Sequence, residues 1–457
     1  MSEAQRHCHP SRPPDRPLCH HIPVLRLDHE GDPCLLEVKL ARGQPGRTPL
    51  LIGSCVIVLA NWISSGTRSM IVGKGLSISE YPRFSKEEMS RRREEVEAIA
   101  ADRGVGHVLI YGSKGSTSTP WLTGWPVTNQ AIAVVTPGEP ILLFVQLFNH
   151  VPNAQELASM ATVTWGGTDT FEAVSDTIRA RGGGMVGWIG DLPHHGASRL
   201  TRTVSSIIDI SEEYTKLRMV KSAEEIEWMR LGASLTDDSL DALMDVITVG
   251  ATELDYVAAV EYAYLAQGGT NHIHFLATTP MANPSRFAPF QWPSSRATEP
   301  GDVILTELST SYWGYPGQLL RTIIVEEEPT QLYRELHDVA DAAFEAVAAE
   351  VRHGAHARHL FEASMIIGES GYTIFDDLVH GFGGGYLPPV IGTDNRLLEP
   401  VPDVVLESGM TIVIQPNVVT PDHRAGVQTG ELILVTQTGF ERLHNAPTGL
   451  ARRPHSE

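Results

Sequence analysis

Four residues of this sequence have the clearest capacity for chemistry. They are the histidines His272, His274 and His380 and the carboxylate Glu307, which lies in a predicted strand. His272 and His274 alternate with apolar residues, a period that would place both imidazoles on one face of a strand. His380 stands directly before the glycine-rich stretch GFGGG. Glu307 lies within an apolar strand pattern, where a buried carboxylate is costly unless it has partners.

Each of these features also has a purely structural interpretation, and the sequence leaves both open. His380 could cap or stabilise a loop, and His272 and His274 could line a pocket or fill a core. The stretch GFGGG does not predict a phosphate site, because no strand, P-loop lysine or helix frames it. Three aromatic residues close in sequence instead predict an aromatic-lined pocket for a cyclic or weakly polar compound: Phe287, Phe290 and Trp292.

The positions of the cysteines indicate the redox compartment of the protein and whether the amino-terminal segment could hold a zinc ion. Cys8, Cys19, Cys34 and Cys55 all precede residue 56, so no disulfide framework can hold the main body together. This distribution fits a reducing compartment, and we expect a cytoplasmic protein. The cysteines and histidines of this segment lack the paired spacing of a zinc site.

Length and charge narrow the class of protein. A chain of 457 residues with 42% hydrophobic and 20% charged residues is typical of a globular protein with more than one domain. A formal charge of −20 repels phosphate backbones and anionic lipid, which argues against nucleic-acid and membrane partners. The longest apolar run, residues 50–63, is shorter than the ~20 residues of a membrane-spanning helix.

The pattern of elements predicts an α/β domain followed by an α+β domain. A capping box at Ser222 and Glu225 marks the change, and we place the new domain near Tyr214. We predict four segments: a poorly ordered extension over 1–69, an α/β domain over 70–213, an α+β domain over 214–450, and a tail over 451–457. Expected helices cover 85–103, 253–267, 331–351 and 356–369. Expected strands cover 105–111, 131–135, 141–145, 185–189, 303–308, 319–325, 411–414 and 432–436.

Several stretches, read in order, resemble the superfamily of creatinases, prolidases and Xaa-Pro aminopeptidases. They are WLTGW near Trp121, LRMVKSAEEIEWMR, EPGDVILTELSTSYWGYPGQLLRTIIV, HGFGGGYLPP, LESGMTIVIQPNVV and GVQTGELILVTQTGFERL. The resemblance implies a creatinase-like α/β amino-terminal domain and an α+β pita-bread catalytic domain. It also implies a homodimer.

In metal-dependent members of that superfamily, two Asp, one His and two Glu hold two divalent cations. The matching positions here are Glu307, Gln318, Gly384, Gln415 and Gly430, with Glu431 adjacent to the last. Two divalent cations ~3.5 Å apart repel by roughly 19 kcal/mol at an effective dielectric near 20. Two carboxylates and two neutral amides do not offset that repulsion, so we expect neither a metal pair nor another cofactor. The sequence leaves open a single weakly held ion on Glu307, Glu431 and His380.

Creatinase-like members imply that the fold can hydrolyse a carbon–nitrogen bond without metal. By that resemblance His380 and Glu307 are the candidate acid–base groups. Gln318 and Gln415 would supply neutral hydrogen bonds, Glu431 would bind a substrate cation, and Arg321 would orient an anionic group. The catalytic histidine of creatinase falls on Phe290 and is missing. We therefore add the nearby His272, His274, Phe290 and Trp292 as substrate-binding candidates.

Three functions follow from these observations. The first is a metal-independent hydrolase or lyase acting on a small nitrogenous metabolite. The second is a proline-directed metallopeptidase with unusual ligands, and the third is a non-catalytic binding protein that kept the fold. Metal content and turnover separate the three.

Overall fold

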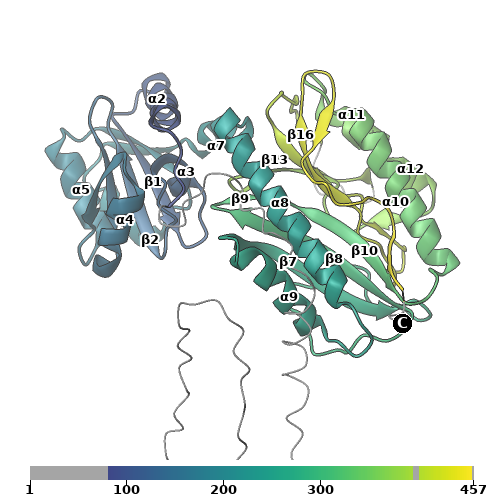
Figure 1. Cartoon of the computed structure of the whole chain (residues 1–457). Coiled ribbons are helices and arrows are strands. Elements are labelled where there is room, and N and C mark those ends of the chain that lie inside the picture. The colour runs from purple at the N-terminus through teal and green to yellow at the C-terminus, as the bar shows by residue number, and fades with distance from the viewer. Residues whose placement is uncertain (1–80, 395–400, 455–457) are drawn as a thin grey trace, which may run out of the picture. The chain divides into compact units, whose positions relative to one another are not determined.

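The computed structural model describes residues 81–394 and 401–454, which carry two large sheets and one short two-stranded sheet (Figure 1). The predicted extension over 1–69 lies outside these residues. All of the described residues belong to one compact unit. The boundaries at 213/214 and 450/451 stay predictions, although residues 451–453, which we assigned to the tail, form a strand of the larger sheet.

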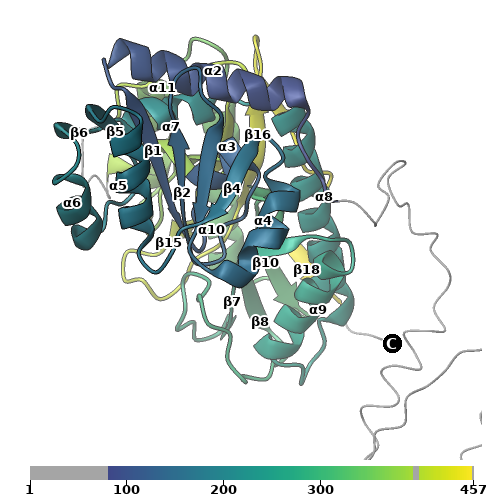
Figure 2. The same ribbon diagram turned by 90° about the vertical axis from the view of Figure 1, so that its left-hand side faces the viewer.

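The first sheet has six strands in the order β4-β3-β2-β1-β5-β6. Its two faces are covered by different helices, which Figure 2 shows with this sheet toward the viewer. Helices α5 and α6 contribute Phe171, Ile178 and Leu200 to one core, whereas α2, α3 and α4 contribute Val96 and Leu157 among others to the second. The strands are β1 (His107–Ser113), β2 (Gln130–Val135), β3 (Ile141–Val145), β4 (Ala161–Trp165), β5 (Met185–Ile189) and β6 (Ser206–Asp209). The helices are α2 (Lys86–Asp102), α3 (Ser118–Thr123), α4 (Val151–Leu157), α5 (Thr170–Ala180) and α6 (His194–Leu200).

The second sheet has ten strands and a main order of β13-β12-β14-β16-β10-β8-β7. Neighbouring strands along this path are antiparallel, as expected for the α+β part. The strands are β7 (Thr270–Pro280), β8 (Asp302–Tyr312), β9 (Tyr315–Pro316), β10 (Leu319–Val325), β12 (Val379–Phe382), β13 (Tyr386–Ile391), β14 (Thr411–Ile414), β16 (Gly430–Val435), β17 (Phe440–Arg442) and β18 (Ala451–Arg453). A separate short pair joins β11 (Thr373–Ile374) to β15 (Val418–Val419).

Helices cover this second sheet in two groups (Figure 1). The capping box predicted at Ser222 and Glu225 is confirmed and begins α8. Helices α8 and α9 pack on β7 and β8, whereas α10 packs over the part of the sheet that contains β14. The helices are α7 (Ser211–Met219), α8 (Ala223–Val246), α9 (Glu253–Leu265), α10 (Gln331–Ala349), α11 (Ala357–Ala363) and α12 (Ile366–Glu369). The helix predicted over 356–369 is thus interrupted between α11 and α12.

One buried carboxylate joins residues from distant parts of the chain. Glu225 accepts hydrogen bonds from Trp121 Nε1 and from the hydroxyl of Tyr315, both at 2.8 Å. Arg92 of α2 lies 3.2 Å from the same carboxylate oxygen. All four side chains are buried, so the carboxylate is satisfied by groups that the fold brings from α2, α3 and β9 in addition to the backbone N–H of Ser222 in the capping box.

Within the described ranges, no helix combines the length and apolar character needed to cross a membrane.

Candidate active site

Three polar side chains predicted from two motifs meet on the larger sheet. Glu307 lies in β8, opposite Leu320 of β10. Gln318, directly before β10, donates its Nε2 hydrogens to Glu307 Oε1 at 3.0 Å and to Gln415 Oε1 at 3.3 Å. All three polar side chains are buried. Three of the positions that we matched to metal ligands from the sequence therefore lie together in the structure.

The environment of Glu307 favours its protonated form. Burial raises the pKa of the Glu307 carboxyl group to about 8, and the nearby Asp376 carboxylate acts in the same direction. A carboxyl group with such a pKa keeps its proton at neutral pH and can donate it. In the described chain, Gln318 Oε1 has no hydrogen-bond partner. A buried acceptor of this kind is ordinarily satisfied by water or a ligand.

His380 lies on β12 beside this cluster and is buried. Burial lowers the pKa of its imidazole to about 4, although Gly381, Asp377 and Gln415 act to raise it. Its Nδ1 lies 3.2 Å from the carbonyl oxygen of Gly381, and its ring stacks on Tyr386 at 4.4 Å between centroids. If Nδ1 carries the proton, Nε2 is left as an acceptor. The imidazole is neutral at physiological pH and able to accept a proton.

The two histidines of β7 do not act as a pair. The strand register shifts between Asn271 and Ile273, so a β-bulge interrupts the alternation that would have placed both imidazoles on one face. His272 borders a cavity and lies 5.3 Å, ring to ring, from Phe382 of β12. His274 Nε2 instead lies 3.1 Å from Glu261 of α9. Only His272 is near the cluster.

Arg321 and Glu431 engage each other. Arg321 Nη2 lies 3.1 Å from Glu431 Oε2, and Arg442 Nη2 lies 2.8 Å from the same oxygen. Arg321 also donates to the carbonyl oxygens of Gly430 and Pro447, both at 2.8 Å. Glu431 is 1% exposed. These contacts describe a buried ion network, and the proposed roles in substrate binding would require it to open.

The predicted aromatic residues Phe287, Phe290 and Trp292 do not line the cavity that His272 borders. Trp292 is 86% exposed and Phe290 is 42% exposed. Phe290 exchanges main-chain hydrogen bonds with Leu276, and Arg286 lies over its ring at 4.7 Å. Neither aromatic residue lines that cavity.

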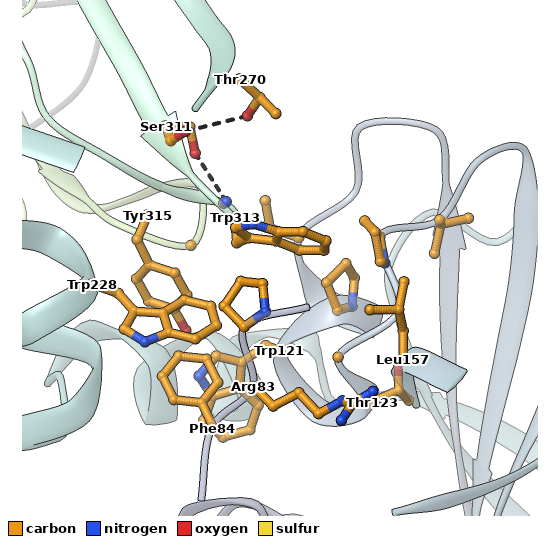
Figure 3. A pocket seen from close by; sticks show the side chains of 18 of the residues that line it. Arg83, Phe84, Trp121, Thr123, Leu157, Trp228, Thr270, Ser311, Trp313 and Tyr315 are labelled. Atoms are coloured by element: carbon orange, nitrogen blue, oxygen red, sulfur yellow. Dashed lines mark hydrogen bonds between the residues drawn. The ribbon is translucent and has the colours of Figure 1, made fainter. Parts of the chain in front are cut away.

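The cavity has a volume of about 370 Å³ (Figure 3). The aromatic residues that line it are not the ones that we predicted from the sequence. It extends to His272 and Gly384, next to the polar cluster. Its aromatic members are Phe84, Trp121, Trp228, Trp313 and Tyr315.

Two further groups of the site were missed by sequence reasoning. Asp376 contributes to the raised pKa of Glu307, and Asp377 acts on His380. Asn417 Nδ2 donates to Asp376 at 3.3 Å, and Gln415 Nε2 donates to the carbonyl oxygen of Asp377 at 3.0 Å. The adjacent aspartates between β11 and β12 were visible in the sequence, but no pattern connected them to β8.

Comparisons with known proteins agree with this architecture. A model of metallopeptidase family M24 matches residues 227–437. The chain is 28% identical over 239 residues to an Xaa-Pro dipeptidase of Pyrococcus furiosus, covering 51% of this chain and 65% of that protein. An uncharacterised peptidase of Bacillus subtilis is 23% identical, with 78% and 98% covered.

Solved structures show the same fold. The prolidase of Pyrococcus horikoshii superposes with a TM-score of 0.69 at 21% identity, covering 78% of this chain and 99% of that one. The X-Pro aminopeptidase of Thermotoga maritima gives a TM-score of 0.70 at 19% identity, with 79% and 99% covered. The chain therefore has the pita-bread fold of these peptidases, and its residues 227–437 are similar to metallopeptidase family M24. The alignment to the Pyrococcus furiosus dipeptidase spans just under two thirds of that protein.

A metal pair is the expected centre of an M24 metallopeptidase, but the residues of this pita-bread protein do not fit one. The cluster offers Glu307, which favours its proton, and the neutral amides of Gln318 and Gln415. Glu431 is held by two arginines. Among the residues that the structure describes, no group of three or more His, Cys, Asp or Glu side chains could hold a metal ion.

The position that corresponds to the metal-binding histidine is also unsuited to a cation. Gly384 has a φ of 68°, which a histidine would adopt only with strain. Arg218 donates to its carbonyl oxygen, and a Cβ atom at Gly384 would lie 3.5 Å from Arg218 Nη2. Arg218 is buried. This pita-bread protein therefore holds a positive charge beside the place where metal-dependent relatives hold a metal ligand.

Proposed function

We propose that this protein is a hydrolase that cleaves a carbon–nitrogen bond of a small peptide-like or nitrogenous compound by side-chain acid–base chemistry. The observation that carries the proposal is the buried contact between Glu307 and Gln318 at 3.0 Å, in which Glu307 has its pKa raised to about 8. Such a carboxyl group is a proton donor at neutral pH. His380, whose pKa is lowered to about 4, is the complementary acceptor.

The proposed reaction balances with water as the second reactant. Neutral His380 takes a proton from water as the oxygen attacks the carbon of the scissile bond. The Glu307 carboxyl group protonates the leaving nitrogen, and the carbon–nitrogen bond breaks. The proton held by His380 then returns to the Glu307 carboxylate through the product or solvent, which restores both groups. Gln318 and Gln415 would orient the carboxyl group and the substrate through neutral hydrogen bonds.

The comparisons favour a peptide-like substrate over a creatine-like one, because the relatives named above are Xaa-Pro dipeptidases and other peptidases. We therefore propose Xaa-Pro dipeptides as the first substrates to examine. A metallopeptidase with unusual ligands is the second candidate function, and the match to the M24 model supports it. The donor set around Glu307 supports the metal-independent mechanism.

The deciding experiment combines turnover with metal content. Full-length protein is purified from medium supplemented with manganese, cobalt and zinc, and hydrolysis of a panel of Xaa-Pro dipeptides and other small amides is followed by amine release. We expect turnover that survives chelation, together with far less than one bound ion per chain. Activity that disappears on chelation and returns with one metal would establish the metallopeptidase instead. Absence of turnover on the whole panel would favour a binding protein.

Homodimer formation and cytoplasmic location are also part of this proposal. Sedimentation analysis of the purified protein and fractionation of cells that express it would test them.

A further inference from the structure

The cavity of about 370 Å³ is within the size range of pockets that bind small molecules, which is ~300–1,000 Å³. Aromatic side chains from four separate segments contribute to its lining. Phe84 stacks on Trp228 with ring centroids 4.0 Å apart, and Tyr315 packs edge-on against Trp228 at 5.6 Å. In Figure 3, Trp313 lies along one edge of the pocket, and Trp228 and Phe84 lie together on another side.

Trp313 occupies a backbone position that ordinarily disfavours it. The residues Trp313 and Gly314 form a two-residue turn between β8 and β9, because Tyr312 pairs with Tyr315. Their φ values are 50° and 92°. Two-residue hairpin turns with positive φ strongly prefer Asn followed by Gly, and a bulky residue at the first position is an outlier. Strained residues of this kind concentrate at functional sites.

The charge of the cavity lining also departs from that of the chain. Asp and Glu make up 55 of the 457 residues, yet neither lines this cavity. Its lining includes one arginine, Arg83, which is exposed. Arg83 Nη2 donates a hydrogen bond to the carbonyl oxygen of Glu156 at 2.9 Å. Hydroxyl and amide side chains supply the remaining polar surface, including those of Thr270 and Asn271. A cation would find no countercharge here, whereas an anion would find Arg83.

We propose that this cavity binds a planar aromatic ring that carries an anionic group, with the ring against Trp313 and the Phe84–Trp228 wall and the anion toward Arg83. Because His272 and Gly384 extend the lining to the polar cluster, such a compound is the substrate class of the adjacent site. That last step rests on the proposed hydrolase function. Binding in the cavity does not, and it can be measured without turnover.

Calorimetric titration of the full-length protein tests the proposal with three probes. Indole-3-acetate has the ring and the charge, tryptamine has the same ring with a positive charge, and cyclohexaneacetate has the charge without the aromatic ring. We expect indole-3-acetate to bind about tenfold or more tightly than either of the other two. Equal affinity for tryptamine would overturn the assignment of charge, and equal affinity for cyclohexaneacetate would overturn the assignment of the ring.

Two variants assign the binding to this cavity. Trp313→Asn introduces the residue that the turn prefers, so the fold should persist, and we expect it to weaken indole-3-acetate binding about tenfold. Arg83→Gln should remove the preference for indole-3-acetate over neutral indole-3-acetamide. Trp165→Leu is the control, because Trp165 is 43% exposed and does not line the cavity. Circular dichroism verifies folding of each variant.

Unchanged affinity in both Trp313→Asn and Arg83→Gln would overturn the proposal, as would the absence of saturable binding by wild-type protein. Neither result affects the hydrolase proposal, which depends on Glu307. Conversely, a wild-type protein that binds indole-3-acetate but hydrolyses no amide would leave the cavity assignment intact and reject the hydrolase.

Discussion

The side-chain amide of Gln318 donates to the carboxyl group of Glu307 at 3.0 Å, within the cluster where metal-dependent relatives have charged ligands. The amide N–H can donate to either the neutral or the ionised carboxyl group, and it is burial that favours the protonated form of Glu307. A protonated glutamic acid and a neutral amide lack the negative charge that a pair of divalent cations requires. The predictions below depend on this distinction.

Replacement of the carboxyl group tests its role as an acid. We expect Glu307→Gln to lower kcat by ~10²–10⁴-fold, because the amide keeps hydrogen bonds but cannot transfer a proton. Steady-state kinetics on the substrate found in the panel measure this change. Glu139→Gln, on the exposed turn between β2 and β3, is the matched control and should leave kcat unchanged. Full activity of Glu307→Gln would contradict the mechanism.

The raised pKa of Glu307 also predicts how stability depends on pH. The folded pKa is about 8 against an ordinary value of 4.5, so between these values the folded state holds a proton that the unfolded chain has lost. The contribution of this group to stability is therefore complete below pH 4.5 and is lost as pH rises through about 8. Urea denaturation across pH 5 to 9 should show this decline in wild-type protein and a flatter profile in Glu307→Gln. Parallel profiles would place the pKa of Glu307 near its ordinary value.

The network around Glu431 should be important for folding. We expect Glu431→Gln to reduce the free energy of unfolding by roughly 3–5 kcal/mol, because Arg321 and Arg442 would lose the carboxylate they share. A control is available in Glu441→Gln, which breaks a more exposed pair with Arg230 and should cost ~0–1 kcal/mol. Chemical denaturation of both variants gives the comparison. Similar small losses in both would show that Glu431 is free to serve a ligand.

Restoring a histidine at position 384 should not restore a metal site. The positive φ of Gly384 and the proximity of Arg218 make Gly384→His unfavourable, and we expect a loss of roughly 1–3 kcal/mol in stability. Thermal melts with and without zinc or cobalt measure the effect. An increase in the melting temperature on adding either ion, absent in wild-type protein, would show that the site accepts a cation after all.

The fold could be predicted well because its elements carry strong local patterns. The capping box at Ser222, the apolar strands around Glu307 and the turn between β2 and β3 identify their elements without tertiary information. The meeting of Glu307, Gln318 and Gln415 could be anticipated because the motifs that contain them have a constant order in the superfamily. Helix α10 was also predicted to within two residues.

The rest of the site depends on contacts that sequence periodicity does not encode. A β-bulge separates His272 from His274, and no residue in that strand predicts a bulge at this position. The aromatic cavity combines Phe84, Trp228 and Trp313, which lie far apart in the sequence. Its single local signal was a tryptophan in a two-residue hairpin turn, which is interpretable only once the pairing of β8 with β9 is known.

The position of Glu225 has a consequence for dissecting this protein. Its carboxylate accepts a hydrogen bond from Trp121 of α3 and forms an ion pair with Arg92 of α2. Both residues precede the predicted boundary near residue 214. A fragment that begins at that boundary would lose the guanidinium that neutralises this carboxylate, the indole N–H that donates to it and the apolar surface of α2 and α3. Truncations designed to isolate residues 214–450 should therefore yield insoluble material, and co-expression with residues 81–213 should recover it.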